Sequence, residues 1–296
     1  MRVFVTGATG FIGSAIVKEL ISAGHEVLGL ARNDTAANSL ITAGAEVHRG
    51  DLEDSESLLN GVSKADGVIH TGFIHDFTRF KEVCETDRRA IEAMGSALIG
   101  TDRPLIITSG TALAASGQLA IETTRAVGSP HPRVASEEAA DALAAKGVRV
   151  AVVRLPPSVH GEGDHGFVPI LINIARQKGV SAYKDEGLNR WPAVHRLDAA
   201  HLFRLALENN FVAGTRFHSV AEEGVPFKQI AEVIGKRLNV PVISKAGEEA
   251  TAHFEWFAHF TSLDNPSASK QTQQQLSWKA VQPGLIADID NDYYFV

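Results

Sequence analysis

The stretch Val3-Phe4-Val5-Thr6-Gly7-Ala8-Thr9-Gly10-Phe11-Ile12-Gly13 places a short apolar strand before three spaced glycines, and an amphipathic helix follows directly. A strand that ends in a glycine turn and opens a helix points unpaired backbone N–H groups and the positive end of the helix dipole at one place, which suits a pyrophosphate. Gly7 permits the tight turn, Gly10 lets phosphates approach the backbone, and Gly13 lets helix and strand pack closely. We therefore interpret the stretch as a dinucleotide-binding turn rather than a merely structural one. The predicted cofactor contacts are Gly7, Thr9, Gly10, Phe11, Ile12 and Gly13.

Strand-like and helix-like segments alternate through the first half of the chain. This alternation, with apolar strands and short connections, predicts a doubly wound parallel sheet, the Rossmann form of an α/β fold. The expected strands are 3–6, 26–31, 46–49, 67–70, 105–108 and 148–154, and the expected helices are 11–22, 35–43, 55–59, 78–99 and 134–145. Residues 110–132, rich in small and polar side chains, are expected to form a loop system over the site.

The pattern changes after Arg154, where prolines and glycines break the alternation. Helical patterns follow at 167–177, 197–208, 227–238 and 248–260, with short strands between them. We expect an NAD(P)-binding Rossmann domain over residues 1–155 and a smaller C-terminal substrate-binding cap over residues 156–296, with elements that interleave with the first.

Composition excludes several classes of protein. The 296 residues are 44% hydrophobic and 21% charged, with a formal net charge of −7, which disfavours nonspecific nucleic-acid binding. No apolar window is long enough for a membrane span. The first core strand begins at Arg2 or Val3, so we expect no signal peptide, and a single cysteine cannot form an internal disulfide. These features predict a cytoplasmic protein with no membrane partner, and the absence of metal-ligand spacing predicts no metal site.

Arg32 follows the second expected strand, at the place where dinucleotide-binding folds meet the adenosine ribose. An acidic residue there would bind the 2′-hydroxyl of NAD, whereas an arginine suits the 2′-phosphate of NADP. A strand-end surface arginine is the alternative, and nearby Asp34 would place a carboxylate near the ribose after a small shift in register. We predict NADP(H) as the preferred cofactor, with NAD(H) possible.

Polar groups also follow the third and fourth strands. The Asp51 carboxylate can accept from the adenine amino group while Leu52 covers the ring; helix capping is the competing role of Asp51, although Asp54 is better placed for it. After the fourth strand, Thr71 could donate its hydroxyl to the cofactor, and His70 is expected to be a packed strand-end histidine.

Further motifs follow in order along nearly the whole chain: Asp51-Leu52, Thr108-Ser109-Gly110, Arg154-Leu155-Pro156 with Val159-His160-Gly161, and Val194-His195-Arg196-Leu197-Asp198. With the glycine stretch, they make the chain similar to the extended form of the short-chain dehydrogenase/reductase superfamily. In detail it resembles a fungal and bacterial subgroup of NAD-dependent epimerase/dehydratase-like proteins, part of which is associated with aldehyde reductase activity. The resemblance implies that Thr108, Pro156 and Val159 also contact the cofactor.

The chain departs from that family at its Tyr-x-x-x-Lys motif, because none of the three tyrosines has a lysine four residues later. In the best match to the motif's helix, Arg133 takes the tyrosine position and Glu137 the lysine position. Glu137 is then a candidate to hold ribose hydroxyls, and Arg133 a candidate to stabilise a developing alkoxide, although arginine is a poor proton donor. An ordinary ion pair between the two on the helix surface is an equal alternative.

The remaining candidates concern the substrate. Ser109 corresponds to the family's serine, whose hydroxyl could polarise a carbonyl; a strand-end turn serine is the alternative. For the proton the sequence offers His131, Tyr183, His195 or water. The resemblance places the substrate pocket along residues 183–195. The predicted pocket residues are Tyr183, Arg190, Trp191 and His195.

Together these observations predict an atypical oxidoreductase that reduces a small aldehyde or ketone by hydride transfer from nicotinamide. Reduction tolerates a weak acid better than alcohol oxidation tolerates a missing base, because water can quench an alkoxide. A sugar-nucleotide epimerase or dehydratase is therefore a weaker interpretation. The alternative from another class is a protein that binds NADP(H) and senses its redox state without catalysis. A small-molecule carbonyl compound is the expected partner, and the helix over 78–99 could supply the face of a homodimer.

Overall fold

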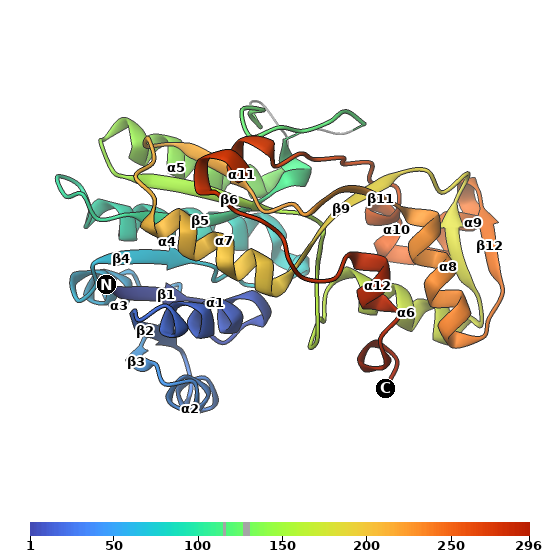
Figure 1. Ribbon diagram of the computed structural model, residues 1–296, viewed down its shortest axis with the longest axis horizontal. Coiled ribbons are helices and arrows are strands. Elements are labelled where there is room, and N and C mark those ends of the chain that lie inside the picture. Colours follow the sequence, from blue (N-terminus) through green and yellow to red (C-terminus); the bar gives the residue numbers. More distant parts are fainter. Residues whose placement is uncertain (115–116, 127–130) are drawn as a thin grey trace.

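The computed structural model of the protein describes residues 1–114, 117–126 and 131–296 (Figure 1). Within these residues, seven parallel strands form one sheet in the order β10-β6-β5-β4-β1-β2-β3. The chain runs outward from β1 in both directions, which confirms the predicted doubly wound α/β fold. The strands of this sheet are β1 (Arg2–Thr6), β2 (Glu26–Ala31), β3 (Glu46–Arg49), β4 (Gly67–His70), β5 (Leu105–Gly110), β6 (Val150–Leu155) and β10 (Thr215–His218).

Helices cover both faces of this sheet. On one face α1, α2 and α7 bury apolar side chains such as Leu20 and Phe203. On the opposite face α3, α4 and α5 bury residues such as Leu58 and Leu143. The helices are α1 (Phe11–Ser22), α2 (Asp34–Thr42), α3 (Ser55–Ser63), α4 (Phe80–Ser96), α5 (Ala135–Ala145) and α7 (Arg196–Glu208), with 3-10 turns η1 (Phe77–Arg79), η2 (Thr111–Leu113) and η3 (Pro132–Val134).

Most of the remaining chain forms a cap, at the right of the sheet in Figure 1. Its core is rich in aromatic side chains, among them Trp191, Phe227 and Phe257. The strands outside the main sheet are β7 (Ser158–His160), β8 (Ser181–Lys184), β9 (Arg190–His195), β11 (Glu222–Pro226) and β12 (Val242–Lys245). The helical segments are α6 (Phe167–Lys178), α8 (Phe227–Leu238), α9 (Gly247–Phe254), η4 (Glu255–Phe257), α10 (Ala258–Thr261), α12 (Leu285–Ile289) and η5 (Asp292–Tyr294), while α11 (Lys270–Leu276) packs near α7.

The structure differs from the sequence-based expectation in three segments. The helix expected over 78–99 ends at Ser96, after the 3-10 turn η1. The helix expected over 248–260 is broken at Glu255, whose φ of 52° is incompatible with a continuous helix. One of the short strands expected between the later helices, β10, joins the main sheet beside β6 rather than the cap. Residues 115–116 and 127–130 of the expected loop system lie outside the described residues.

None of the helices in the described residues combines the length and the apolar character needed to cross a bilayer. Likewise, no group of three or more His, Cys, Asp or Glu side chains in the described ranges is arranged to hold a metal ion.

Candidate functional site

A cleft of about 960 Å³ runs between the sheet and the cap, a volume typical of ligand-binding clefts. All of the predicted cofactor contacts except Glu137 line it, and they come from the seven strands β1 to β7, the turns after them and the start of α1. The predicted residues along its walls are Gly7, Thr9, Gly10, Phe11, Ile12, Gly13, Arg32, Asp51, Leu52, Thr71, Thr108, Pro156 and Val159.

The glycine turn has the geometry that a bound pyrophosphate requires. Gly7 has a φ of 64°, and a Cβ atom there would lie 2.6 Å from the backbone nitrogen of Gly72. A Cβ atom on Gly13 would lie 2.0 Å from the carbonyl oxygen of Gly7, so only glycine lets α1 start this close to β1. No described side chain caps the N-terminus of α1, and its first N–H groups therefore remain available to an anion. These features fit the diphosphate of a dinucleotide cofactor.

At the adenosine end of the cleft the structure separates the two candidate residues after β2. Arg32 lines the cleft and, among the described residues, forms no ion pair. Asp34 lies in the first turn of α2, with a side chain that is 89% exposed and pairs with Arg49. The guanidinium, not the carboxylate, is therefore the group available to a ribose in this cleft. Asp54 caps α3, as predicted, which leaves Asp51 on the cleft wall.

Arg133 lies on the cleft wall, and neighbouring residues fix the position of its guanidinium. Its Nη1 atom lies 2.6 Å from Oδ2 of Asp87 on α4, and its Nη2 atom donates to the carbonyl oxygen of Thr108 at 3.2 Å. The guanidinium carbon lies 4.3 Å from the ring centroid of Phe73, a cation–π contact. Its side chain is 17% exposed, so part of it faces the cleft. These contacts fix a permanent positive charge at the site that the sequence assigned to the missing tyrosine.

Asp87, which holds Arg133, is itself almost fully buried. The Nε2 atom of His70 lies 3.0 Å from Oδ1 of Asp87, and its Nδ1 atom lies 2.6 Å from the hydroxyl of Thr6. His70 is thus the packed strand-end histidine that the sequence predicted. Burial alone would raise the pKa of Asp87, but the charge of Arg133, with hydrogen bonds from His70 and Ser136, lowers that pKa to about 2.

This low pKa predicts an acid-dependent contribution of Asp87 to stability. The carboxylate stabilises the folded state above its unfolded pKa of about 4, and this contribution is lost as the pH falls from there toward 2. A pKa lowered from about 4 to about 2 corresponds to about 3 kcal/mol at neutral pH. The difference in free energy of unfolding between wild type and Asp87→Asn, measured by urea titration, should be constant from pH 6 to 8. It should shrink between pH 4 and pH 3, and a difference that does not change over this range would contradict the assignment.

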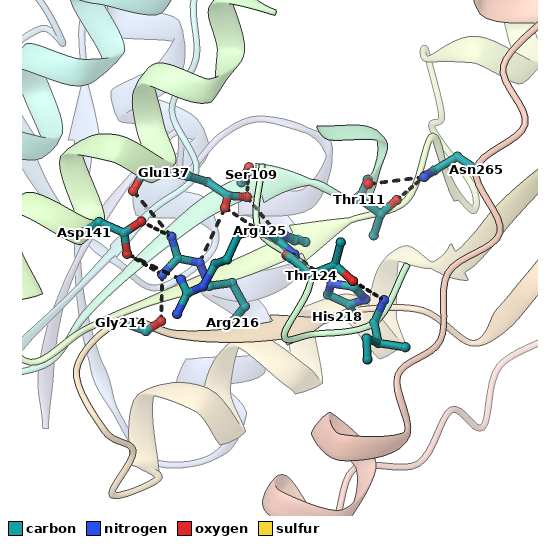
Figure 2. Close-up of polar contacts among 12 residues, drawn as sticks. Ser109, Thr111, Thr124, Arg125, Glu137, Asp141, Gly214, Arg216, His218 and Asn265 are labelled. Carbon is teal, nitrogen blue, oxygen red and sulfur yellow. Dashed lines mark hydrogen bonds and ion pairs between the residues drawn. The ribbon is translucent and has the colours of Figure 1, made fainter. Parts of the chain in front are cut away.

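The roles predicted for Ser109 and Glu137 are not those that the structure gives them. Alternate residues of a strand face opposite sides of a sheet, so Thr108 lines the cleft while Ser109 faces α5. There the Ser109 hydroxyl donates to Oε1 of Glu137 at 2.8 Å, and the proton that would polarise a carbonyl is already engaged (Figure 2). The carboxylate of Glu137 is buried and also binds Arg154, and neither Ser109 nor Glu137 lines the cleft.

The alternative of a surface ion pair between Arg133 and Glu137 is also wrong. Arg133 pairs with Asp87, and Glu137 pairs with Arg154 at 2.7 Å and Arg216 at 3.4 Å. The two residues therefore belong to separate buried networks, although they share one helical region.

None of the four residues predicted for the substrate pocket lines this cleft. Trp191 is fully buried in the core of the cap, and Tyr183 packs at the edge of that core. The Nε and Nη2 atoms of Arg190 each donate a hydrogen bond to the carboxylate of Asp264 at 2.9 Å. The Nδ1 atom of His195 accepts from the backbone of Leu197 and caps α7. The contacts of this segment are within the cap and at the start of α7.

Another part of the cleft wall is aromatic. Its lining residues come from the turn after β4, the start of α4, the start of α6 and the broken helix near Glu255. They are Phe73, Phe80, Phe167, Trp256 and Phe260. The aromatic run around residues 253–260 was a signal in the sequence, but only the break at Glu255 decides which of its rings face the cleft.

Titratable groups that line the cleft differ from the predicted proton donors, since His131, Tyr183 and His195 are not among the described lining residues. Burial lowers the pKa of His75, as do the charges of His165 and Arg133. Burial raises the pKa of Asp164, whose carboxylate accepts from the Gly166 backbone and the Tyr294 hydroxyl. Both shifts favour the uncharged form of these two groups.

Comparison with known proteins agrees with this architecture. The sequence pattern of the NAD dependent epimerase/dehydratase family matches residues 3–218. An uncharacterized protein of Schizosaccharomyces pombe is 54% identical over 296 residues, with 100% of each chain covered. The 2-alkyl-3-oxoalkanoate reductase of Stenotrophomonas maltophilia is 29% identical over 86% of this chain and 80% of its own.

Solved structures share the fold at low sequence identity. The dTDP-glucose 4,6-dehydratase DesIV of Streptomyces venezuelae, solved with NAD and TYD bound, superposes with a TM-score of 0.76. It is 18% identical, and the match covers 98% of this chain and 95% of DesIV. The resemblance predicted from the glycine turn and the later motifs is confirmed. The chain belongs to the NAD dependent epimerase/dehydratase family.

Proposed function

We propose that the protein is an NADPH-dependent reductase of an aldehyde or ketone. The observation that carries this proposal is a single cleft with a dinucleotide-binding glycine turn, an unpaired arginine at the ribose end and a fixed guanidinium, Arg133, at the other wall. The relative named 2-alkyl-3-oxoalkanoate reductase supports carbonyl reduction within this family.

Different residues of the cleft would have different roles in such a reaction. The glycine turn and the N-terminus of α1 would hold the diphosphate, and Arg32 would hold the 2′-phosphate. When bound, the reduced cofactor supplies the hydride that the carbonyl carbon accepts. Arg133 would bind the carbonyl oxygen and stabilise the negative charge that develops on it. That oxygen then takes a proton from water and becomes the hydroxyl of the product alcohol.

The charge of Arg133 favours reduction over epimerisation or dehydration. An enzyme that begins by oxidising an alcohol needs a base to remove the hydroxyl proton. Arginine remains protonated at any physiological pH and cannot serve as that base. In a reduction, the same fixed charge stabilises the alkoxide, so the structure of this wall suits the reductive direction.

Loss of NADPH absorbance with a panel of aldehydes and ketones tests the proposal on purified protein. We expect turnover with at least one carbonyl compound. Tight NADPH binding without turnover of any compound would contradict a reductase, and would favour a protein that senses NADP(H).

Replacing Arg32 with alanine is expected to raise the Kd for NADPH by about 10–100-fold, because a charge-assisted contact to a phosphate contributes about 1.5–3 kcal/mol. The Kd for NADH should change by less than about threefold. Calorimetry with both cofactors measures the difference. Arg49→Ala is the matched control, since Arg49 pairs with Asp34 and does not line the cleft. An equal loss of NADPH and NADH affinity would refute the role of Arg32.

A further inference from the structure

We propose that the substrate is a flat, apolar carbonyl compound, an aromatic aldehyde or ketone, whose ring lies among Phe73, Phe80, Phe167, Trp256 and Phe260. This inference rests on the proposed function, because it names the substrate class of the same cleft. It also separates this chain from relatives that are named for sugar nucleotides.

The aromatic side chains that line this part of the cleft include two contacting pairs. The ring of Phe167 lies 4.7 Å from that of Phe260, centroid to centroid, and the ring of Phe73 lies 6.5 Å from that of Phe80. One pair belongs to the cap and the other to the turn and helix that follow β4. A planar ring placed between such pairs finds edge and face contacts at the distances that aromatic groups prefer.

Trp256 is exposed at the cleft, whereas its neighbour Phe257 is buried in the core of the cap. The left-handed backbone of Glu255 breaks the helix and turns successive rings in different directions. As a result Phe257 is fully buried in the core of the cap, while Trp256 lies at the cleft with 61% of its surface exposed. Trp256 packs 6.4 Å from Phe260, centroid to centroid, and so extends a contiguous apolar surface along the cleft, which is typical of a ligand-binding groove.

The part of the cap that begins at Phe167 brings apolar side chains to the cleft, whereas Asp164 and His165 line the cleft just before it. From Phe167 onward, the described residues that the cap contributes to the cleft are Phe167, Val168, Ile170, Trp256 and Phe260, and none is charged. Arg190, which was expected to face a substrate, is neutralised by Asp264. A sugar nucleotide carries two phosphate charges that require cationic or N–H partners, and this wall supplies neither in its side chains.

The carbonyl end of the proposed substrate is defined by Arg133. Its guanidinium lies over the ring of Phe73, so the positive charge and the aromatic wall are adjacent. A substrate whose carbonyl oxygen contacts Arg133 therefore places its apolar part against Phe73 and toward the cap. An aldehyde conjugated to a ring has this division between a polar end and an apolar body.

The test compares kcat/KM for cinnamaldehyde, butanal and UDP-glucose in wild type and in Trp256→Ala. In wild type we expect cinnamaldehyde to exceed butanal by at least about tenfold, the order expected when apolar contacts discriminate substrates. In Trp256→Ala, kcat/KM for cinnamaldehyde should fall by at least about tenfold, whereas that for butanal should change by less than about threefold. Leu188→Ala is the matched control, because Leu188 is 68% exposed on the cap and does not line the cleft.

A binding measurement gives a readout that does not depend on turnover. Cinnamyl alcohol added with NADP⁺ should change the fluorescence of Trp256, and this change should be absent in Trp256→Phe. The other tryptophans, Trp191 and Trp278, are buried and serve as the internal reference. Equal kcat/KM for butanal and cinnamaldehyde would overturn the substrate class and leave a reductase standing. Turnover of UDP-glucose, which has no free carbonyl group to reduce, would overturn both the substrate class and the proposed reductase. Failure to consume NADPH with any carbonyl compound would overturn the proposed function and this inference with it.

Discussion

Replacement of Glu137 by glutamine is expected to lower the free energy of unfolding by about 3–5 kcal/mol, because it leaves a buried arginine without its counterion. Arg154 is fully buried, and its Nε and Nη2 atoms each lie 2.7 Å from an oxygen of Glu137. Glutamine has the same shape as glutamate but no charge, so it fills the same volume and leaves the positive charge of Arg154 without a negative partner. Urea unfolding followed by far-UV circular dichroism measures the change.

The surrounding groups show why no neighbour can replace Glu137. Burial would raise the pKa of Glu137, but Arg154 and Arg216 lower it, which keeps the carboxylate ionised. Arg216 has a second partner in Asp141, as Figure 2 shows, whereas Arg154 depends on Glu137 for its charge. His218 lies 3.3 Å from Arg154, and burial together with that arginine lowers the pKa of His218 to about 4. A neutral imidazole accepts a hydrogen bond here but carries no negative charge.

The adjacent residue provides the control for this expectation. Glu138 lies on the same helix and pairs with Arg88, but its side chain is 56% exposed. Glu138→Gln should lower the free energy of unfolding by no more than about 1 kcal/mol, as is usual for a surface ion pair. If the two substitutions destabilised the protein equally, the buried carboxylate would not be the group that compensates Arg154.

The cofactor end of the cleft could be predicted from the sequence because its residues are local. Each follows a strand, and parallel strands bring their carboxyl ends to one edge of the sheet. Gly7 and Arg32 therefore needed no knowledge of distant contacts. The role of Glu137 could not be predicted in this way, because it depends on Arg154, which lies on β6, the strand that follows the helix of Glu137. The spacing of Arg133 and Glu137 predicted a shared helix face, but tertiary partners separated them.

The sequence analysis did not predict the aromatic lining of the cleft, for a related reason. The family resemblance pointed to residues 183–195, and the structure uses that segment to build the core and edge of the cap. Which rings of the run 253–260 face the cleft depends on one left-handed residue, Glu255, and sequence periodicity does not reveal such a break. The sequence shows that this segment is rich in aromatic residues, but not which of their side chains face the cleft.

Replacement of Arg133 by alanine is expected to lower kcat for carbonyl reduction by about 10²–10³-fold, the usual effect of removing a group that stabilises a developing oxyanion. The Kd for NADPH should change little, because the phosphate contacts lie at the glycine turn and at Arg32. Arg133→Lys should recover part of the loss, since it restores the charge without the planar fork. Stopped-flow reduction of a saturating aldehyde separates the chemical step from binding.

The control must account for the charge of Asp87, which loses its partner when Arg133 is removed. The double variant Arg133→Ala/Asp87→Asn removes both charges, so we expect its stability to recover relative to Arg133→Ala while its turnover does not. Arg88→Ala is the matched single control, because Arg88 also bridges α4 to α5 and does not line the cleft. If turnover recovered together with stability in the double variant, Arg133 would act by supporting the fold. Persistent loss of kcat in a stable double variant would instead place the guanidinium at the reacting oxygen.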